Sequence, residues 1–155
     1  MKFALLTLTA AVVASIAATA SAGLGWPVWA MFVGWVAFFT GGHSARAALT
    51  SYLCVAAGIG FGVFAAMAVG SLLPLIDFFA FGVVVFVVAV VVVSLRAAPL
   101  LNNVAAYFLG LIAFFASHLA PGLAAFIELA VAGGLGTLAA WIAHQLSGKV
   151  ARYAA

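Results

Sequence analysis

Long uncharged stretches, separated by short groups of polar residues, glycines and prolines, run through the chain from one end to the other. A helix that crosses ~30 Å of hydrocarbon needs about 20 residues, so each long stretch is a candidate transmembrane helix. The valine-rich stretch at residues 78–95 is far too long for a buried strand. The pattern predicts an all-α integral membrane protein with six transmembrane helices in a single domain, residues 1–155. We place them at about residues 3–22, 26–40, 47–72 and 78–95, between Asn103 and His118, and at 123–145.

The first stretch has two interpretations. Residues Phe3 to Ala22 follow Lys2 and are uncharged throughout, so they can form a membrane-spanning helix. The same residues also fit a secretory signal peptide, because the small side chains at residues 18–22 resemble a peptidase cleavage site. We favour the uncleaved helix, because the stretch at residues 79–95 would otherwise have no counterpart in the first half of the chain.

A short motif occurs twice. FVGWVAFF at residues 32–39 returns as FLGLIAFF at residues 108–115, with an offset of 76 positions (108 − 32) and no gap. The same offset relates two stripes of small residues, which we expect to pack closely against neighbouring helices. These helix-packing residues are Ala48, Ala56 and Gly60 in the first copy and Ala124, Ala132 and Gly136 in the second.

The two copies cover about residues 3–72 and 76–147, and each contains three of the expected spans. Because three is an odd number, the second copy must enter the membrane upside down relative to the first. The sequence therefore predicts an inverted 3+3 repeat. That architecture recurs in transporters and channels, where binding sites lie between the two halves.

Composition agrees with this class. Hydrophobic residues make up 70% of the chain, charged residues only 5%, and the mean hydropathy is +1.43. Such a chain cannot cover its apolar surface with polar side chains, so a water-soluble domain is excluded. The single cysteine, Cys54, excludes a disulfide framework and is interpreted as a small packing residue.

The basic residues indicate how the protein is oriented in the membrane. With a cytoplasmic amino terminus, every one of them falls on the cytoplasmic side of the membrane, as membrane proteins prefer. They are Lys2, Arg46, Arg96, Lys149 and Arg152. We therefore expect a multi-pass protein with both termini in the cytoplasm. The formal net charge of +3 is spread over several connections and forms no basic cluster, so no nucleic-acid partner is expected.

The order of motifs resembles a known family. WAMFVGWVAFFTGG at residues 29–42 is followed by a glycine-containing third span, by LLP at residues 72–74 and by FLGLIAFFA at residues 108–116. This order, which covers about residues 26–147, resembles the YcdZ-like bacterial inner-membrane proteins, a group known as a domain of unknown function. The resemblance implies a bacterial inner-membrane location and implies no activity or site residues.

Glu128 is the first candidate for a functional role, because ionisable side chains inside a membrane are costly and usually face a protein interior. It lies about six residues into the sixth expected span, among small side chains. One interpretation makes it a hydrogen-bonding residue that ties helices together. The other places it at the mouth of a solute path, where His118 is a candidate partner and Tyr52 the counterpart near the opposite mouth.

Asn102 completes the candidates for a transport path, although its simplest role is to cap the fifth helix. The three histidines share no ligand spacing with a cysteine or a second carboxylate, so we expect no metal site. The sequence has no phosphate-binding glycine loop, nucleophile elbow or carboxylate pair. We therefore expect neither an enzyme nor a bound cofactor.

Two function classes remain. The first is a channel or facilitator for a small neutral solute, with a path between the two inverted repeats. The alternative is a non-transporting structural or accessory subunit of a membrane complex, which the scarcity of polar lining residues favours. In both cases the lipid bilayer is the surrounding partner, and we expect a homo-oligomer because six short helices leave a large apolar surface.

Overall fold

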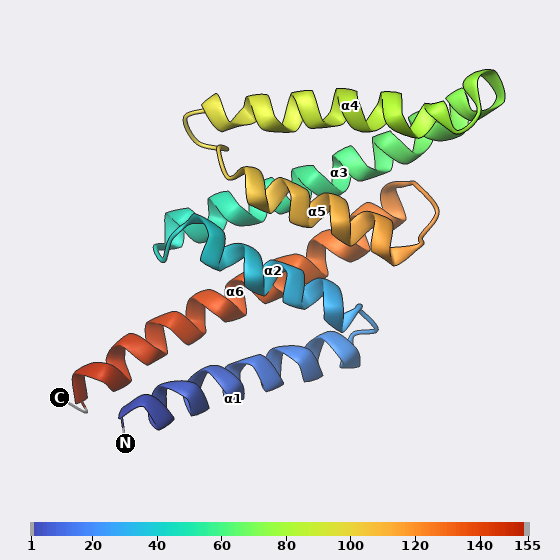
Figure 1. Ribbon diagram of the computed structural model, residues 1–155. Helices are drawn as coiled ribbons and strands as arrows, with labels where there is room; N and C mark the ends of the chain where they lie inside the picture. Colours follow the sequence, from blue (N-terminus) through green and yellow to red (C-terminus); the bar gives the residue numbers. More distant parts are fainter. Residues whose placement is uncertain (1, 154–155) are drawn as a thin grey trace.

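The computed structural model describes residues 2–153, and the side chains of residues 3–152. These residues form an all-helical protein without strands (Figure 1). The elements are α1 (Lys2–Gly23), α2 (Val28–Gly41), α3 (Ala45–Ile76), α4 (Phe79–Ser94), the short 3-10 turn η1 (Leu95–Ala97), α5 (Val104–Ser117) and α6 (Leu123–Tyr153). The expected all-α class is confirmed.

Four helical segments are long and apolar enough to cross a membrane, as judged by their length and composition. They are α1, α3, α4 with η1, and α6. The remaining helices, α2 and α5, are apolar but have only 14 residues each. The structure is therefore consistent with the insertion of several of its helices into a membrane.

Two helices are longer than expected. Helix α3 continues past residue 72 to Ile76, with Pro74 inside it, and α6 continues past residue 145 to Tyr153. Pro74 has no N–H group to donate to the Gly70 carbonyl oxygen four residues before it, and α3 ends two residues after it. The helix then ends at Asp77, whose φ is 49° and whose N–H donates to the Leu73 carbonyl over 2.9 Å.

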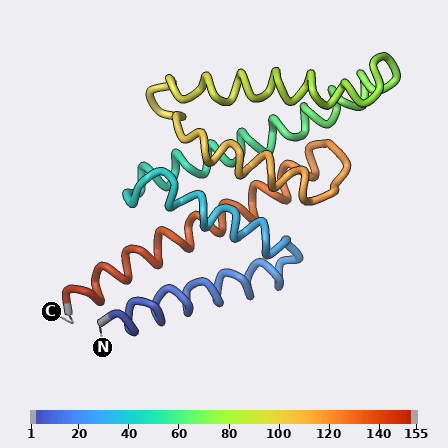
Figure 2. The backbone as a smooth tube through the Cα atoms, viewed as in Figure 1, coloured from blue at the N-terminus to red at the C-terminus, as the bar shows by residue number. Residues whose placement is uncertain are grey.

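The helices pack in a consistent pattern. Helix α2 lies along α6 and α5 along α3, while α3 and α6 also contact each other. Helices α1 and α4 occupy opposite edges, where α1 packs mainly on α6 and α4 mainly on α3 (Figure 1). Because successive helices run in opposite directions, α1 begins and α6 ends on the same side of the molecule (Figure 2).

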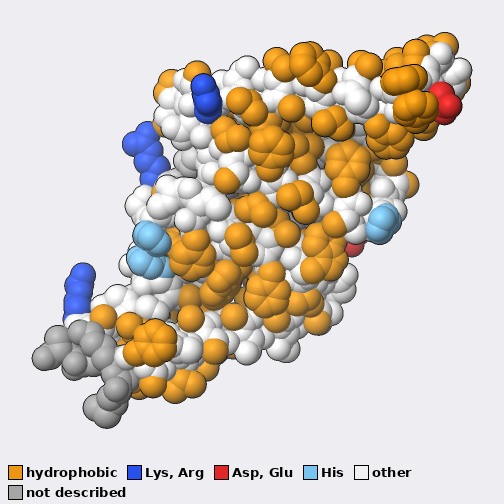
Figure 3. Space-filling model, viewed as in Figure 1, with side chains coloured by type: hydrophobic (Ala, Val, Ile, Leu, Met, Phe, Trp, Pro, Cys, Tyr) orange, Lys and Arg blue, Asp and Glu red, His pale blue; other side chains and the backbone are white. Residues whose placement is uncertain are grey.

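The charged side chains separate to the two ends of this bundle (Figure 3). We call the end that carries the starts of α3 and α5 and the end of α6 the basic end; Arg46, Arg96, Lys149 and Arg152 belong to it. We call the opposite end, where α3 ends and α6 begins, the acidic end. It carries Asp77, directly after α3, and Glu128, in the second turn of α6.

The core contains close contacts between helix backbones as well as buried large side chains such as Phe38 and Tyr107. At four glycines an added Cβ atom would overlap a carbonyl oxygen of a neighbouring helix, so only glycine permits these approaches. The contacts are Gly34 with Gly133 and Gly136 with Met31, between α2 and α6, and Gly58 with Tyr107 and Gly110 with Val55, between α3 and α5.

Candidate functional site: a cavity between α3 and α6

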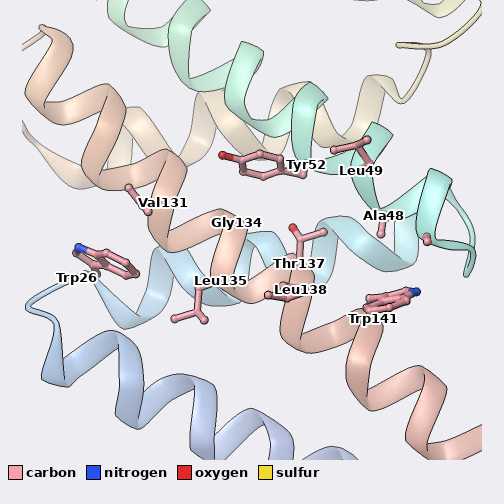
Figure 4. A pocket seen from close by; sticks show the side chains of 11 residues that line it. Trp26, Ala48, Leu49, Tyr52, Val131, Gly134, Leu135, Thr137, Leu138 and Trp141 are labelled. Atoms are coloured by element: carbon pink, nitrogen blue, oxygen red, sulfur yellow. The ribbon is translucent and has the colours of Figure 1, made fainter.

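A cavity of about 530 Å³, open to the surface of the protein, lies between α3 and α6 (Figure 4). Its walls are mostly apolar, and none of the side chains that line it is charged. Small-molecule sites typically combine such apolar walls with a few polar groups that orient the ligand. The lining residues are Trp26 from the α1–α2 connection, Ala45, Ala48, Leu49 and Tyr52 from α3, and Val131, Gly134, Leu135, Thr137, Leu138 and Trp141 from α6.

Tyr52 reaches across the cavity from α3 to α6. An added Cβ atom at Gly134 would lie 3.1 Å from the Tyr52 ring and 3.6 Å from its hydroxyl oxygen, so the ring lies on the bare backbone of α6. The hydroxyl group is carried on the side of the ring that faces Val131 and Trp26 (Figure 4). Tyr52 therefore presents a hydrogen-bonding group within a largely apolar cavity.

Thr137 holds the opposite wall in place. Its side chain is buried, and its hydroxyl group lies 2.9 Å from the Gly34 carbonyl oxygen and 3.0 Å from the Gly133 carbonyl oxygen. The single hydroxyl proton is shared between these two acceptors, which ties α6 to α2. A solute in the cavity would therefore meet Thr137 as an acceptor rather than as a donor.

A second group of polar side chains joins three helices at the basic end. The Asn103 amide nitrogen donates to the Thr40 hydroxyl over 2.8 Å and to the Ser51 hydroxyl over 3.0 Å. The Asn103 amide oxygen accepts the N–H of Ala106 over 3.2 Å and so caps α5. We call Asn103, Thr40 and Ser51 the amide node, because one amide links the end of α2, the body of α3 and the start of α5.

Of the transport-path candidates from the sequence, only Tyr52 lines the cavity. Asn102 is exposed beside the amide node, and its neighbour Asn103 makes the interhelical hydrogen bonds instead. His118 is exposed at the end of α5 with a φ of 54°. Glu128 is partly buried and is not among the lining residues. Among the side chains of residues 3–152 no basic group lies within salt-bridge distance of Glu128, His118 included.

The helix-packing residues named from the sequence have different neighbours. Gly136 lies against the Met31 carbonyl, whereas an added Cβ at Gly60 would meet only the Phe126 ring, at 3.7 Å. Ala48 and Ala132 are buried, Ala56 is partly buried and Ala124 is exposed. In α3 the close backbone contact is made by Gly58, two positions before Gly60.

Several residues of these sites were not singled out from the sequence. One sequence feature could have pointed to three of them: they are hydroxyl side chains in otherwise apolar helices, namely Thr40, Ser51 and Thr137. Trp26 and Trp141 were not separable from other interfacial aromatic residues. In residues 2–153 there is no group of three or more His, Cys, Asp or Glu side chains able to hold a metal ion.

Comparison with known proteins identifies a family and no activity. Neither the comparison with curated proteins nor that with solved structures gave a significant match. Residues 7–144 match the model of the family described as "Protein of unknown function (DUF1097)". This match covers all of the helices that form the cavity except the last turns of α6. The chain therefore belongs to the DUF1097 family of proteins of unknown function.

Proposed function

We propose that the protein is a membrane facilitator for a small, neutral, weakly polar solute, which binds in the cavity between α3 and α6. The observation that carries this proposal is the cavity of about 530 Å³ with apolar walls, the Tyr52 hydroxyl group and no charged lining residue. A charged solute would lose its hydration there without gaining a partner, which is costly. An uncharged solute with one hydrogen-bonding group would lose little hydration free energy on entering the cavity.

The proposal includes six membrane crossings in two inverted three-helix repeats, with the cavity between the repeats. Helix contacts support it, because α2 packs on α6 just as α5 packs on α3. The bounds of α5 are those of α2 shifted by 76 residues (104 − 28 and 117 − 41). The contact of Gly58 with Tyr107 then corresponds to the contact of Gly136 with Met31. Tyr107 follows Met31 by 76 residues (107 − 31), and Gly136 follows Gly58 by 78 residues (136 − 58).

This correspondence changes the alignment of the two copies. The α2–α3 connection has three residues, 42–44, and the α5–α6 connection has five, 118–122. Two additional residues therefore shift α6 relative to α3, and Gly58, rather than Gly60, is the proposed counterpart of Gly136. The ungapped offset of 76 then applies to α2 and α5 only.

In the proposed orientation the basic end faces the cytoplasm of a bacterial cell and the protein resides in the inner membrane. The separation of basic and acidic side chains supports this orientation through the preference of cationic side chains for the cytoplasmic side (Figure 3). Glu128 and His118 then lie near the outer mouth of the path, and Asn102 near the cytoplasmic mouth. Their proposed role is to contact the solute before and after it occupies the cavity.

A flux assay in proteoliposomes with a panel of small neutral solutes tests this function. Leu138→Trp should fill the cavity and lower flux about tenfold, because the cavity would no longer admit a ligand. Ile127→Trp is a matched control, since both residues lie on α6 with similar exposure, 52% and 51%, and Ile127 is not a lining residue. Flux equal to that of empty vesicles for every solute, or equal loss in both variants, would refute the proposal.

Two further variants separate the proposed roles within the same assay. Tyr52→Phe removes the hydroxyl group and should lower flux about fivefold for solutes that hydrogen-bond, as expected from the loss of ~1 kcal/mol. Glu128→Gln keeps the shape of the side chain but removes its titration, so it should alter the pH dependence of flux while leaving the fold intact. A Gln variant that transports like wild type at every pH would exclude Glu128 from the path.

A structural or accessory subunit is the second candidate function. The exposure of α1 and α4 favours it, because only 6% and 17% of their most apolar segments are buried within the chain. Such faces are suited to contact with lipid or with further copies of the protein. Cross-linking in native membranes that yields a fixed homo-oligomer, together with absence of flux, would favour this candidate.

A further inference from the structure

Two histidines stack on each other at the basic end. The imidazole rings of His43 and His144 have centroids 4.5 Å apart and planes inclined by 22°. The buried Phe38 ring lies 5.9 Å from each of them and supports the pair from within the bundle. His43 belongs to the connection between α2 and α3, and His144 belongs to α6. The stack therefore joins this connection to α6.

The stack adjoins one end of the cavity. His43 comes two residues before Ala45, and His144 comes one helical turn after Trp141. Ala45 and Trp141 both line the cavity, on opposite walls. The stack consequently brings the α2–α3 connection against α6 where the cavity approaches the basic end.

The stack consists of two titratable side chains, and both are exposed. Histidine changes its charge between about pH 5 and 8, and two like charges at the separation of these rings repel each other, with water screening the repulsion because both side chains are exposed. The basic side chains on the joined elements are Arg46 on α3 and Lys149 and Arg152 on α6, and α2 has no ionisable residue.

Among residues 3–152 no carboxylate side chain lies at this end of the bundle. Asp77 follows the far end of α3, and Glu128 precedes His144 by 16 residues, which is about 24 Å along α6. On α1, which packs against α6, the only ionisable residue is Lys2, whose side chain is outside the described part of the chain. Acidification therefore weakens the contact between the α2–α3 connection and α6.

A second observation concerns the same segment. The indole nitrogen of Trp141 is buried and has no hydrogen-bond partner among the described residues. A buried donor without an acceptor is unfavourable relative to a hydrated one. Separation of α3 from α6 at this end would let water reach the indole N–H and would therefore stabilise the open arrangement.

We propose that the His43–His144 stack is a pH-sensitive clasp, which closes the basic end of the cavity at neutral pH and releases it on acidification. The clasp itself is inferred from the ring geometry, its cationic surroundings and the unpaired indole. Its effect on solute flux rests on the proposed function of the cavity.

Tryptophan fluorescence of the full-length protein tests the clasp without any transported solute. Trp26, Trp29 and Trp35 are changed to Phe, so that Trp141 alone reports through quenching by acrylamide, a neutral molecule. The quenching constant should rise roughly twofold or more between about pH 8 and about pH 5. If the triple variant does not fold, the difference in quenching between wild type and Trp141→Phe supplies the same signal.

Two variants decide the origin of the transition. The double variant His43→Phe/His144→Phe keeps two stacked aromatic rings that do not titrate, so its quenching should be independent of pH. His118→Asn changes the histidine at the opposite end, and its transition should match that of the parent protein. A transition that is absent in the parent, or retained in the double Phe variant, overturns the clasp.

Flux measurements then separate the clasp from the proposed function. If the clasp and the facilitator proposals both hold, acidification of the side facing the basic end raises flux in the parent protein. Flux through the double Phe variant does not change. A quenching transition in a protein without flux supports the clasp and overturns the facilitator. Solute flux without any quenching transition supports the facilitator and overturns the clasp.

Discussion

At the scale of single residues, glycine backbones set the distances between helices. Gly34 and Gly136 bring α2 onto α6, and Gly58 and Gly110 bring α5 onto α3. In a membrane no hydrophobic force drives apolar helices together, because lipid tails are as apolar as the side chains. Close backbone packing and interhelical hydrogen bonds must supply the stability instead. The glycine contacts and the Asn103 and Thr137 hydrogen bonds are both of this kind.

The glycine contacts allow a comparison between two glycines that lie 76 positions apart, Gly60 and Gly136. Gly136→Ala should lower the free energy of unfolding by about 2 kcal/mol or more, because the new methyl group overlaps the Met31 carbonyl. Gly60→Ala should change it by less than about 1 kcal/mol, since the new methyl group meets only the Phe126 ring. Thermal unfolding in detergent measures both, and equal midpoints would contradict the observed packing.

The amide node allows a second comparison. Asn103→Ala removes the cap of α5 and leaves the Thr40 and Ser51 hydroxyl groups without their shared donor, so it should cost about 2 kcal/mol. Asn102→Ala alters an exposed side chain and should cost less than about 0.5 kcal/mol. The same unfolding assay applies. If the two variants behave alike, the amide node does not hold these helices together.

At the scale of helices, short and long elements support one another. An α-helix of 14 residues is about 21 Å long, which is less than the ~30 Å of a hydrocarbon core. Helices α2 and α5 pack along α6 and α3, which have 31 and 32 residues. The amide node supplies polar partners at the ends of α2 and α5. Neighbouring helices can therefore shield the ends of the short ones from lipid.

Helix α1 also packs as part of the bundle. Ala17 is 4% exposed and shares a buried cluster with Met31 and Ala139, whereas the adjacent Ile16 is 64% exposed. Ala17→Phe should therefore destabilise the protein by about 1–3 kcal/mol through overpacking. Ile16→Phe on the outer face should be nearly neutral. Equal unfolding temperatures for the two variants would show that α1 does not pack on α6.

At the scale of the whole molecule, basic and acidic side chains occupy opposite ends of the bundle (Figure 3). Each end can therefore be labelled separately through residues that belong to that end alone. Ala98 and Ser147 belong to the basic end, and Asp77 and Gly122 to the acidic end.

Cysteines placed one at a time at these four positions, with Cys54 changed to Ala, test the proposed orientation. A membrane-impermeant thiol reagent applied to intact cells should label Asp77→Cys and Gly122→Cys only, because cationic ends stay in the cytoplasm. Ala98→Cys and Ser147→Cys should react only after the membrane is permeabilised. Labelling of both ends from outside, or of the basic end alone, would refute the orientation.

Sequence patterns predicted the helices well because they depend on local information. Uncharged runs, glycine and proline positions and the scarcity of charge are properties of neighbouring residues, and they located every helix to within several residues. The ends of α3 and α6 were missed, because a proline in a last turn and a few polar residues do not end a helix. Tyr52 was the only transport-path candidate found to line the cavity.

The sequence by itself determined that this is an all-helical membrane-type protein, because its long uncharged runs match membrane-spanning helices, in which every backbone group is bonded within the segment. Only the tertiary structure decided which small residues touch. Gly58 and Gly60 share one helix and have the same local chemistry, and the tilt and shift of α5 across α3 select Gly58. The partners of Asn103 and of the two stacked histidines, and the Gly34 partner of Thr137, lie more than 50 residues away in the chain, so no local pattern could have revealed them.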